Sequence, residues 1–352
     1  MKASDLLVRC LEAEGVDTIF GVPGEENADL MMSLLDSSIE FVICRHEQAA
    51  AFMADMHGRL TGRPGVCLAT LGPGASNLLT GVASANMDDS PLVAIIGQAS
   101  TQRLHKESHQ NMDAVAMFRP VTKWTSTIRE PENINEVVHK AFKLAAAEKP
   151  GATVIELPED IAKKDTDDEP IRARTDDTRA GAEPRHVEAA LGLIEKATAP
   201  VILTGWGVIR TGAANALAEL IGRTHIYAAQ TFMGKGALSA RDEHCLYCVG
   251  LGSRDIVLEA FEQADLVLCI GYDMVEWHPE RWNIGADKHI VHIDTQPAEV
   301  DQDYNPDVEV VGDICAALEA INGRLTASHA KAPSRFADLR ARMTRGLHEH
   351  DG

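Results

Sequence analysis

The stretch that decides the fold is residues 41–54, FVICRHEQAAAFMA, in which an apolar run gives way to a charged junction and then to small apolar residues. The first part is typical of a buried strand, and the alanine-rich part is typical of a helix. Glu47 lies at the junction between them. Ligands of open α/β sheets bind at the carboxyl ends of the strands, so Glu47 is a candidate site residue. On this stretch alone, the favoured interpretation is that Glu47 only stabilises the start of its helix.

Short apolar runs of the same kind recur through the first half of the chain, and helical patterns separate them. These runs are residues 18–20, 41–44, 66–69, 92–96 and 153–157. They are almost continuously hydrophobic, as expected for strands of a parallel sheet that helices cover on both faces. The alternation therefore predicts a doubly wound α/β domain over residues 1–164.

The second half repeats this organisation after a break. Residues 165–184 contain one large apolar side chain, which predicts a linker between domains. A second α/β domain is predicted over residues 185–330. Its expected strands are residues 201–203, 266–270 and 289–293, and its expected helices are residues 185–198, 213–222 and 312–322. Pro333 then opens a polar, arginine-rich helix, so residues 331–352 are expected to lead towards a further domain.

The composition limits the class of partner. The 352 residues carry 33 Lys and Arg against 53 Asp and Glu, a net charge of −20, which argues against nucleic acid or a membrane surface as a partner. No apolar run approaches the roughly 18–20 residues that span a bilayer, and the N-terminus has no signal-peptide core. The seven cysteines are scattered and odd in number, unlike a disulfide framework. These features predict a cytoplasmic protein.

Two further junctions have the same character as the one at Glu47. Residues 69–77, ATLGPGASN, and residues 20–24, FGVPG, each follow a predicted strand. Two glycines flanking a proline make a tight turn, which lets the backbone approach a flat ligand closely. Each stretch alone is an ordinary strand-to-helix loop. Together, at the same edge of one sheet, the three junctions predict the lip of a pocket.

The motifs at these junctions resemble a known family. FGVPG, CRHEQAAAFMA, ATLGPGASNLLTG and SHQNMD together resemble the pyrimidine-binding domain of thiamine-diphosphate enzymes in the acetolactate synthase group. LCIGYD (268–273) and VHID (291–294) resemble their Rossmann-like central domain. The resemblance covers essentially residues 1–352. Within the group, residues 109–113, 118–123 and 271–277 look closest to the catabolic, flavin-independent acetolactate synthases.

This resemblance implies a carboligase that converts two pyruvate molecules into 2-acetolactate and CO2 with thiamine diphosphate as cofactor. It implies that Glu47 hydrogen-bonds nitrogen N1′ of the aminopyrimidine ring, and that Gln110 reaches the thiazolium side and the substrate oxygen. The implied aminopyrimidine pocket is lined by Val22, Pro23, Gly24, Thr70, Pro73 and Asn77. Because the family's active site lies between two subunits, the resemblance also implies a homodimer or homotetramer.

The sequence departs from the family pattern in three places. The family binds the diphosphate and its Mg²⁺ in a third domain, through a Gly-Asp-Gly motif; the nearest string here is Gly312-Asp313-Ile314, expected at an ordinary turn. We therefore expect no metal ligand in these residues, and we expect the first two domains of a three-domain enzyme, inactive alone. Glu25-Glu26-Asn27 stands where catabolic relatives often carry a lysine, which leaves the pyruvate specificity open. Lys149 replaces the flavin-contacting arginine of flavin-dependent synthases, which favours no FAD.

Other motifs give weaker signals. Gly205-Trp206-Gly207 with Gly212 follows a strand, but the spacing is not that of a dinucleotide fingerprint. Cys245 and Cys248 form a single Cys-x-x-Cys pair, so two partly buried thiols are expected rather than zinc ligands. Two rival functions stay open: another thiamine-diphosphate 2-oxo-acid decarboxylase or carboligase on the same scaffold, and a non-catalytic two-domain binding module.

Overall fold

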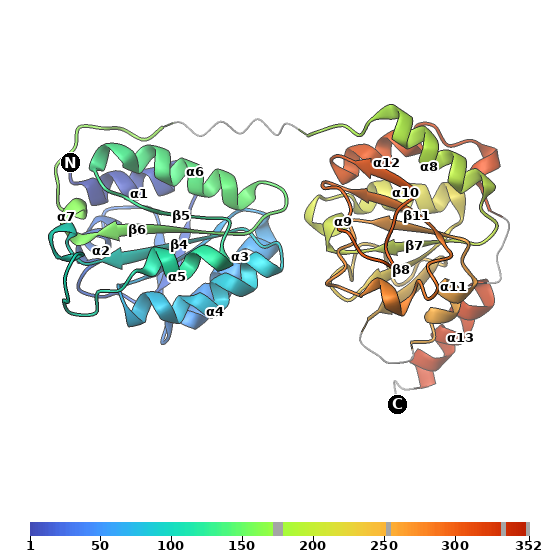
Figure 1. Ribbon diagram of the computed structural model, residues 1–352, viewed down its shortest axis with the longest axis horizontal. Coiled ribbons are helices and arrows are strands. Elements are labelled where there is room, and N and C mark those ends of the chain that lie inside the picture. Colours follow the sequence, from blue (N-terminus) through green and yellow to red (C-terminus); the bar gives the residue numbers. More distant parts are fainter. Residues whose placement is uncertain (172–178, 251–254, 332–335, 350–352) are drawn as a thin grey trace. The chain divides into compact units, whose positions relative to one another are not determined.

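The computed structural model describes residues 1–171, 179–250, 255–331 and 336–349. The chain divides into two compact units, Met1–Asp176 and Asp177–Gly352 (Figure 1). Residues 172–178 of the predicted linker, and Pro333 in the predicted last helix, lie outside the described residues. Within the described part of the chain, no helix is long and apolar enough to cross a membrane.

The first unit is built on a six-stranded parallel sheet in the order β2-β1-β3-β4-β6-β5. Its strands are β1 (Thr18–Gly21), β2 (Glu40–Ile43), β3 (Gly65–Ala69), β4 (Leu92–Gln98), β5 (Trp124–Thr127) and β6 (Ala152–Pro158). The strands β3, β4 and β6 are buried along their whole length, because helices cover both faces of the sheet.

Two layers of helices enclose this sheet. One layer holds α1 (Ala3–Ala13) and α6 (Ile134–Ala146), and the other holds α3 (Glu47–Thr61), α4 (Pro73–Met87) and α5 (Ala114–Phe118) (Figure 1). The short helices α2 (Ala28–Leu34) and α7 (Glu159–Ala162) follow β1 and β6. A Cβ on Gly81 of α4 would lie 2.5 Å from the Cβ of Ala51 on α3. This close approach keeps the N-terminal halves of both helices together, where α3 carries Glu47 and α4 carries Asn77.

The second unit also has a six-stranded parallel sheet, in the order β12-β11-β10-β7-β8-β9, which is the strand order of the Rossmann fold. Its strands are β7 (Pro200–Thr204), β8 (Tyr227–Thr231), β9 (Cys245–Val249), β10 (Leu266–Ile270), β11 (His289–Asp294) and β12 (Val308–Val311). Helices α8 (Pro184–Lys196), α9 (Trp206–Arg210), α10 (Ala214–Thr224) and α12 (Ile314–Asn322) pack on one face, and α11 (Leu258–Gln263) and α13 (Phe336–Glu349) pack on the other.

The predicted fold class, two doubly wound parallel-sheet domains, is confirmed. The sequence patterns did not predict β5, β8, β9 and β12. β5 reads WTST and has no fully buried residue, and β8 reads YAAQT, so neither contains a run of large apolar side chains. The polar helix expected within residues 331–352 is α13, whose Phe336 and Leu339 are buried in the core of the second unit.

Candidate functional site

The predicted site residues gather at the carboxyl edge of the first sheet. Three neighbouring strands deliver most of them: Val22, Pro23 and Gly24 follow β1, Glu47 follows β2, and Thr70, Pro73 and Asn77 follow β3. In the sheet, β2 lies on one side of β1 and β3 lies on the other, so the chain changes direction across the sheet after β2. The edge between β1 and β3 is therefore a topological switch point, where open α/β sheets bind their ligands.

Glycine lets the loops after β1 and β3 touch. A Cβ on Gly24 would lie only 2.5 Å from the Cβ of Thr70, so no larger residue fits here without displacing the threonine. The amide of Gly24 donates to Oδ1 of Asn27 at 2.8 Å, which closes the turn after β1. The amide of Val22 donates to the carbonyl of Leu68 at 3.2 Å. These contacts hold the two loops together on either side of the switch point.

Glu47 is the first residue of α3, but it is not the residue that caps this helix. The cap is His46, whose Nδ1 accepts a hydrogen bond from the amide of Gln48 at 3.1 Å. The half-buried carboxylate of Glu47 instead accepts a hydrogen bond at Oε2 from the side-chain amide of Asn77, at 3.0 Å. Glu47 thus lies in the first turn of α3, where an acidic residue stabilises a helix, but the capping role belongs to His46. Oε1 lies over Gly74, 3.5 Å from the position of a Cβ there.

Gln110 reaches the same edge from a different part of the chain. A Cβ on Gly72, just before Pro73 at the start of α4, would lie 2.5 Å from the carbonyl oxygen of Gln110. Both residues have positive φ, 55° at Gly72 and 53° at Gln110. The side chain of Gln110 is exposed. The structure thus brings Gln110 beside the loop after β3, so the predicted site residues share one edge of the sheet.

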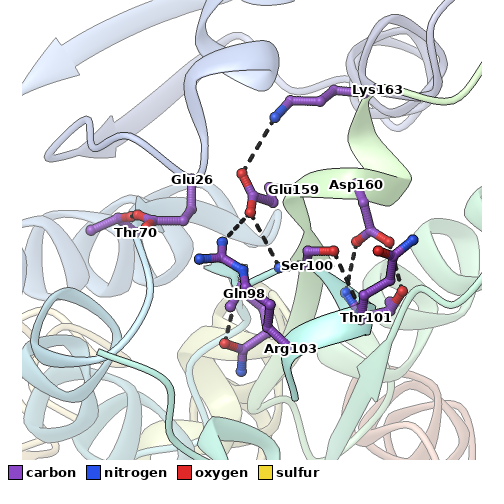
Figure 2. A network of polar contacts seen from close by, with 11 residues as sticks. Glu26, Thr70, Gln98, Ser100, Thr101, Arg103, Glu159, Asp160 and Lys163 are labelled. Carbon is purple, nitrogen blue, oxygen red and sulfur yellow. Dashed lines mark hydrogen bonds and ion pairs between the residues drawn. The ribbon is translucent and has the colours of Figure 1, made fainter. Parts of the chain in front are cut away.

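Sequence reasoning did not predict two further polar groups at this edge. The hydroxyl of Thr70 donates to Oε2 of Glu26 at 3.0 Å (Figure 2). Asn27 is 3% exposed, and its Nδ2 has no hydrogen-bond partner among the described residues. The signal for Glu26 was present in the sequence, because it lies two residues after the Gly-Val-Pro-Gly turn, in the stretch Glu25-Glu26-Asn27 where the sequence departs from the family pattern.

The carboxyl edge of the second sheet has a different character. Its switch point lies between β7 and β10, and there Glu276 is 4% exposed. Its carboxylate accepts a hydrogen bond from the hydroxyl of Thr231 and a bifurcated one from the amide of Trp206, which lies 3.1 Å from both carboxylate oxygens. Burial raises the pKa of Glu276 to about 7, although these hydrogen bonds act in the opposite direction. A buried side chain of the protein therefore occupies this position.

Backbone packing closes the rest of that second edge. The amide of Gly207 donates to the carbonyl of Gly271 at 2.8 Å, and the amide of Gly205 donates to that of Ile270 at 3.1 Å. A Cβ on Gly205 would lie 2.4 Å from the carbonyl oxygen of Gly271. The glycines that suggest a dinucleotide fingerprint thus serve close packing between the loops after β7 and β10.

The remaining motifs have structural roles. Cys245 on β9 is buried and Cys248 is half-buried, and burial raises the pKa of both thiols. In Gly312-Asp313-Ile314, the side chain of Asp313 caps α12 by accepting from the amide of Ala316 at 2.8 Å, so this string is an ordinary turn as expected. Across the described residues, no group of three or more His, Cys, Asp or Glu side chains could hold a metal ion.

Comparison with known families places this geometry in a class. Residues 1–117 match the thiamine pyrophosphate enzyme N-terminal TPP-binding domain, and residues 187–321 match the thiamine pyrophosphate enzyme central domain. The chain therefore belongs to the thiamine pyrophosphate enzymes, of which it carries the N-terminal and central domains, and the predicted family is confirmed.

Within this class, the chain is similar to acetolactate synthases. It is 38% identical over 325 residues to the acetolactate synthase of Bacillus subtilis, covering 91% of this chain and 56% of the relative. It is 39% identical over 324 residues to the catabolic acetolactate synthase of Raoultella terrigena, covering 92% and 58%. A probable acetolactate synthase large subunit of Methanocaldococcus jannaschii is 35% identical over 345 residues, covering 94% and 57%. The chain thus spans about half the length of the curated relatives it matches.

Proposed function

We propose that this chain forms the pyrimidine-binding and central domains of a thiamine-diphosphate-dependent carboligase of the acetolactate synthase type, which converts two pyruvate molecules into 2-acetolactate and CO2. The observation that carries the proposal is the position of Glu47, at the carboxyl edge of the sheet with its Oε2 held by Asn77. The relatives named acetolactate synthase give the proposed substrate and product.

The residues at this edge suit the aminopyrimidine half of the cofactor. Asn77 holds Oε2 of Glu47, which leaves Oε1 to meet a ring nitrogen. Gly24 and Gly74 have no side chain, so the backbone can approach a flat ring from the loops after β1 and β3. Thiamine diphosphate, when bound, supplies the carbanion chemistry, and the protein supplies binding, orientation and electrostatics. In this proposal Glu47 holds a proton at nitrogen N1′ and Gln110 contacts the substrate oxygen.

The diphosphate and Mg²⁺ require other residues. Among the described residues no cluster of metal-binding side chains occurs, and Asp313 is engaged as a helix cap. We therefore propose that Mg²⁺, and with it the diphosphate that it would coordinate, is bound by residues outside the described ranges. FAD is not part of the proposal, because Lys149 stands where the family resemblance implies a flavin-contacting arginine in flavin-dependent synthases.

A second copy of the chain is the proposed partner. The helix that begins at Glu47 exposes a stripe of large apolar side chains, each at least 39% exposed: Phe52, Met53, Met56 and Leu60. Their spacing places them on one face of α3. A contiguous exposed apolar face of this kind favours a protein partner. The proposal is a homodimer or homotetramer in the cytoplasm, and sedimentation of purified protein tests the oligomeric state.

One observation favours a second candidate function on the same scaffold. Glu26 accepts a hydrogen bond from Thr70 at the proposed site, in the stretch where the family resemblance implies a lysine. Replacing a cation by a carboxylate reverses the local charge, and because every 2-oxo acid brings the same anionic carboxylate, this change bears on which substrate side chain the site accepts. The second candidate is therefore a carboligase or decarboxylase that acts on a 2-oxo acid other than pyruvate.

One assay tests these functions together. Acetolactate formation from pyruvate, with thiamine diphosphate and Mg²⁺, is measured for residues 1–352 and for the product of the full open reading frame. Activity of the full product, with little or none in residues 1–352, is the expected result. If the full product is inactive with pyruvate, a panel of other 2-oxo acids tests the second candidate. Inactivity with all of them would favour a binding module.

A further inference from the structure

We propose that three carboxylates at the end of β6 and in α7, Glu156, Glu159 and Asp160, are positioning residues that hold the segment 98–113 in place. This segment, the Gln110 segment, joins β4 to α5 and carries Gln110 to the carboxyl edge of the sheet. The inference rests on the proposed role of Gln110. We call the three carboxylates the acidic clamp.

The first arm of the clamp is buried. Glu156 is 4% exposed and Gln98 is 3% exposed. The side-chain amide of Gln98 donates both to Oε1 of Glu156 at 2.9 Å and to the carbonyl oxygen of Met112 at 3.0 Å. Gln98 thus links a strand in the core of the sheet to a backbone atom two residues from Gln110. The other oxygen of Glu156 accepts from the hydroxyl of Thr127 at 2.7 Å.

This buried arm has a clear energetic logic. A carboxylate in the core is costly unless every oxygen has a hydrogen-bond partner. Burial raises the pKa of Glu156, although the hydrogen bonds from Thr127 and Gln98 act to lower it, and Asp113 raises it further. Gln98 must therefore keep its amide towards Glu156, and this orientation also aims it at the carbonyl of Met112.

The second arm holds the start of the segment (Figure 2). Asp160 accepts from the amide of Thr101 at 2.9 Å and from its hydroxyl at 2.6 Å. Glu159 accepts from the amide of Ser100 at 3.4 Å and pairs with the guanidinium of Arg103. Partial burial acts to raise the pKa of Glu159 and Asp160, but these donors hold both values below the usual range. The first turn of the segment is thus tied to α7.

Gln110 itself depends on these contacts. Its exposed side chain carries no hydrogen bond to another described residue, so the backbone sets the position from which the side chain extends. That backbone rests on Gly72 on one side and is joined to Gln98 through Met112 on the other. The acidic clamp therefore determines how Gln110 is presented at the site.

Two substitutions test the clamp, and each has a matched control. Arg103→Met removes a link between Glu159 and the segment, whereas Lys163→Met removes another cation from the same carboxylate without touching the segment. Gln98→Met removes the bond to Met112, whereas Ser90→Ala removes a buried side-chain bond to the carbonyl of Asp55, outside the segment. Arg103 is 39% exposed, so its variant remains informative if Gln98→Met does not fold.

The readout is hydrogen–deuterium exchange in the Gln110 segment of the 352-residue chain. The amides of Asn111 and Ala114 donate to Ser108 and Met112, so they report the order of the segment. In Arg103→Met and Gln98→Met we expect their exchange to accelerate by about tenfold. Both control variants should match the wild type. Unchanged exchange in Arg103→Met and in folded Gln98→Met, or equal acceleration in Lys163→Met, would overturn the proposal.

A kinetic readout separates positioning from a purely structural role. In the active product of the full reading frame, Arg103→Met should lower kcat with little change in KM or in the thermal midpoint, because a misplaced contact group slows the reaction more than it weakens binding. Lys163→Met should retain kcat. An unchanged kcat in Arg103→Met contradicts the positioning role. If Gln110→Ala retains full activity, the proposed role of Gln110 fails, while the exchange experiment still decides whether the clamp orders the segment.

Discussion

At the switch point of the first sheet, glycine loops leave a carboxylate and a threonine half-buried, whereas at the switch point of the second sheet a buried carboxylate fills the space itself. Glu47 is held by one amide, that of Asn77. Glu276 accepts hydrogen bonds from Thr231 and from the amide of Trp206 in the interior. Both sheets have six parallel strands. The architecture therefore does not determine how exposed a carboxylate at the switch point is, and the residues after the strands do.

The difference has a physical cause in what each carboxylate contacts. Glu47 stands at the start of α3, a helix packed through alanines and glycine, and its Oε1 faces Gly74 in the first turn of α4. Glu276 is enclosed by the backbone of the loops after β7 and β10, so its charge is separated from water. A carboxylate that shares a proton with a ligand needs an oxygen that the ligand can reach, whereas a carboxylate enclosed by the protein does not.

The largest expected effect is at Glu47. In an active form with bound thiamine diphosphate, Glu47→Gln should slow hydrogen–deuterium exchange at the C2 position of the cofactor by about 100-fold or more, because an amide cannot hold the shared proton. NMR of quenched samples measures this rate. Glu40→Gln, at an exposed position on β2, is the control and should keep the wild-type rate. Near-normal exchange in Glu47→Gln would contradict the proposal that Glu47 shares a proton with the cofactor.

The next effect is the pH dependence of stability at Glu276. Its folded-state pKa is raised from 4.5 to about 7, so the stabilisation is complete below 4.5 and is lost as the pH rises through 7. Between about pH 5 and pH 8, the free energy of unfolding should fall by up to about 3 kcal/mol more in the wild type than in Glu276→Gln. Urea unfolding at several pH values measures it.

A control separates this effect from the general charge of the protein. Glu280→Gln changes an exposed carboxylate of the same unit by the same charge. This variant should follow the wild-type pH profile, because an exposed group contributes little to linkage. If the unfolding free energies of Glu276→Gln and the wild type change in parallel with pH, ionisation of the buried Glu276 does not destabilise the protein.

Glycine substitutions at the two edges should differ in cost. A Cβ on Gly207 would lie 2.6 Å from the backbone Cα of Gly271, whereas a Cβ on Gly24 would meet the side chain of Thr70. Gly207→Ala should therefore cost about 2–3 kcal/mol and Gly24→Ala less than that, because the Cβ of Thr70 moves only with its backbone, and the backbone of a half-buried loop shifts more easily than backbone packed in the interior. Gly192→Ala on α8, where a Cβ meets nothing within 4 Å, should cost nothing. If urea unfolding shows that Gly24→Ala destabilises the protein more than Gly207→Ala does, the second edge is not the more tightly packed of the two.

Much of the fold could be predicted from the sequence because the central strands are apolar throughout. β10, LVLCI, was predicted with its observed bounds. β12, VEVV, was missed because it is short and contains a glutamate, and β8 because its buried residues are small or polar. Strands of this kind are held by pairing with neighbours along the sheet, which a local pattern does not reveal.

The candidate site could be predicted where its residues come soon after a strand in the sequence. Glu47 and Thr70 follow strands directly, so the topology of a parallel sheet brings them to one edge. Glu156 and Glu276 were missed because a carboxylate is expected at the surface. For Glu156 a signal existed, since it lies within the apolar run of β6 and must be buried there with a partner. That partner, Gln98, could not be identified from sequence alone.

The smallest effect comes from a pair of threonines that play the same part at the two edges. Each donates its hydroxyl to a carboxylate: Thr70 to Glu26 in a half-buried loop, and Thr231 to Glu276 in the interior. At about pH 8, Thr231→Val should cost about 1.5–3 kcal/mol, because it removes a donor from a buried charge, and Thr70→Val should cost less than about 1 kcal/mol, because water can replace the hydroxyl. Urea unfolding measures both. At about pH 5 the cost at Thr231 should shrink, since Glu276 is then protonated. Equal costs for the two threonines at both pH values would mean that the edges are equally open to water, and the contrast between them would fail.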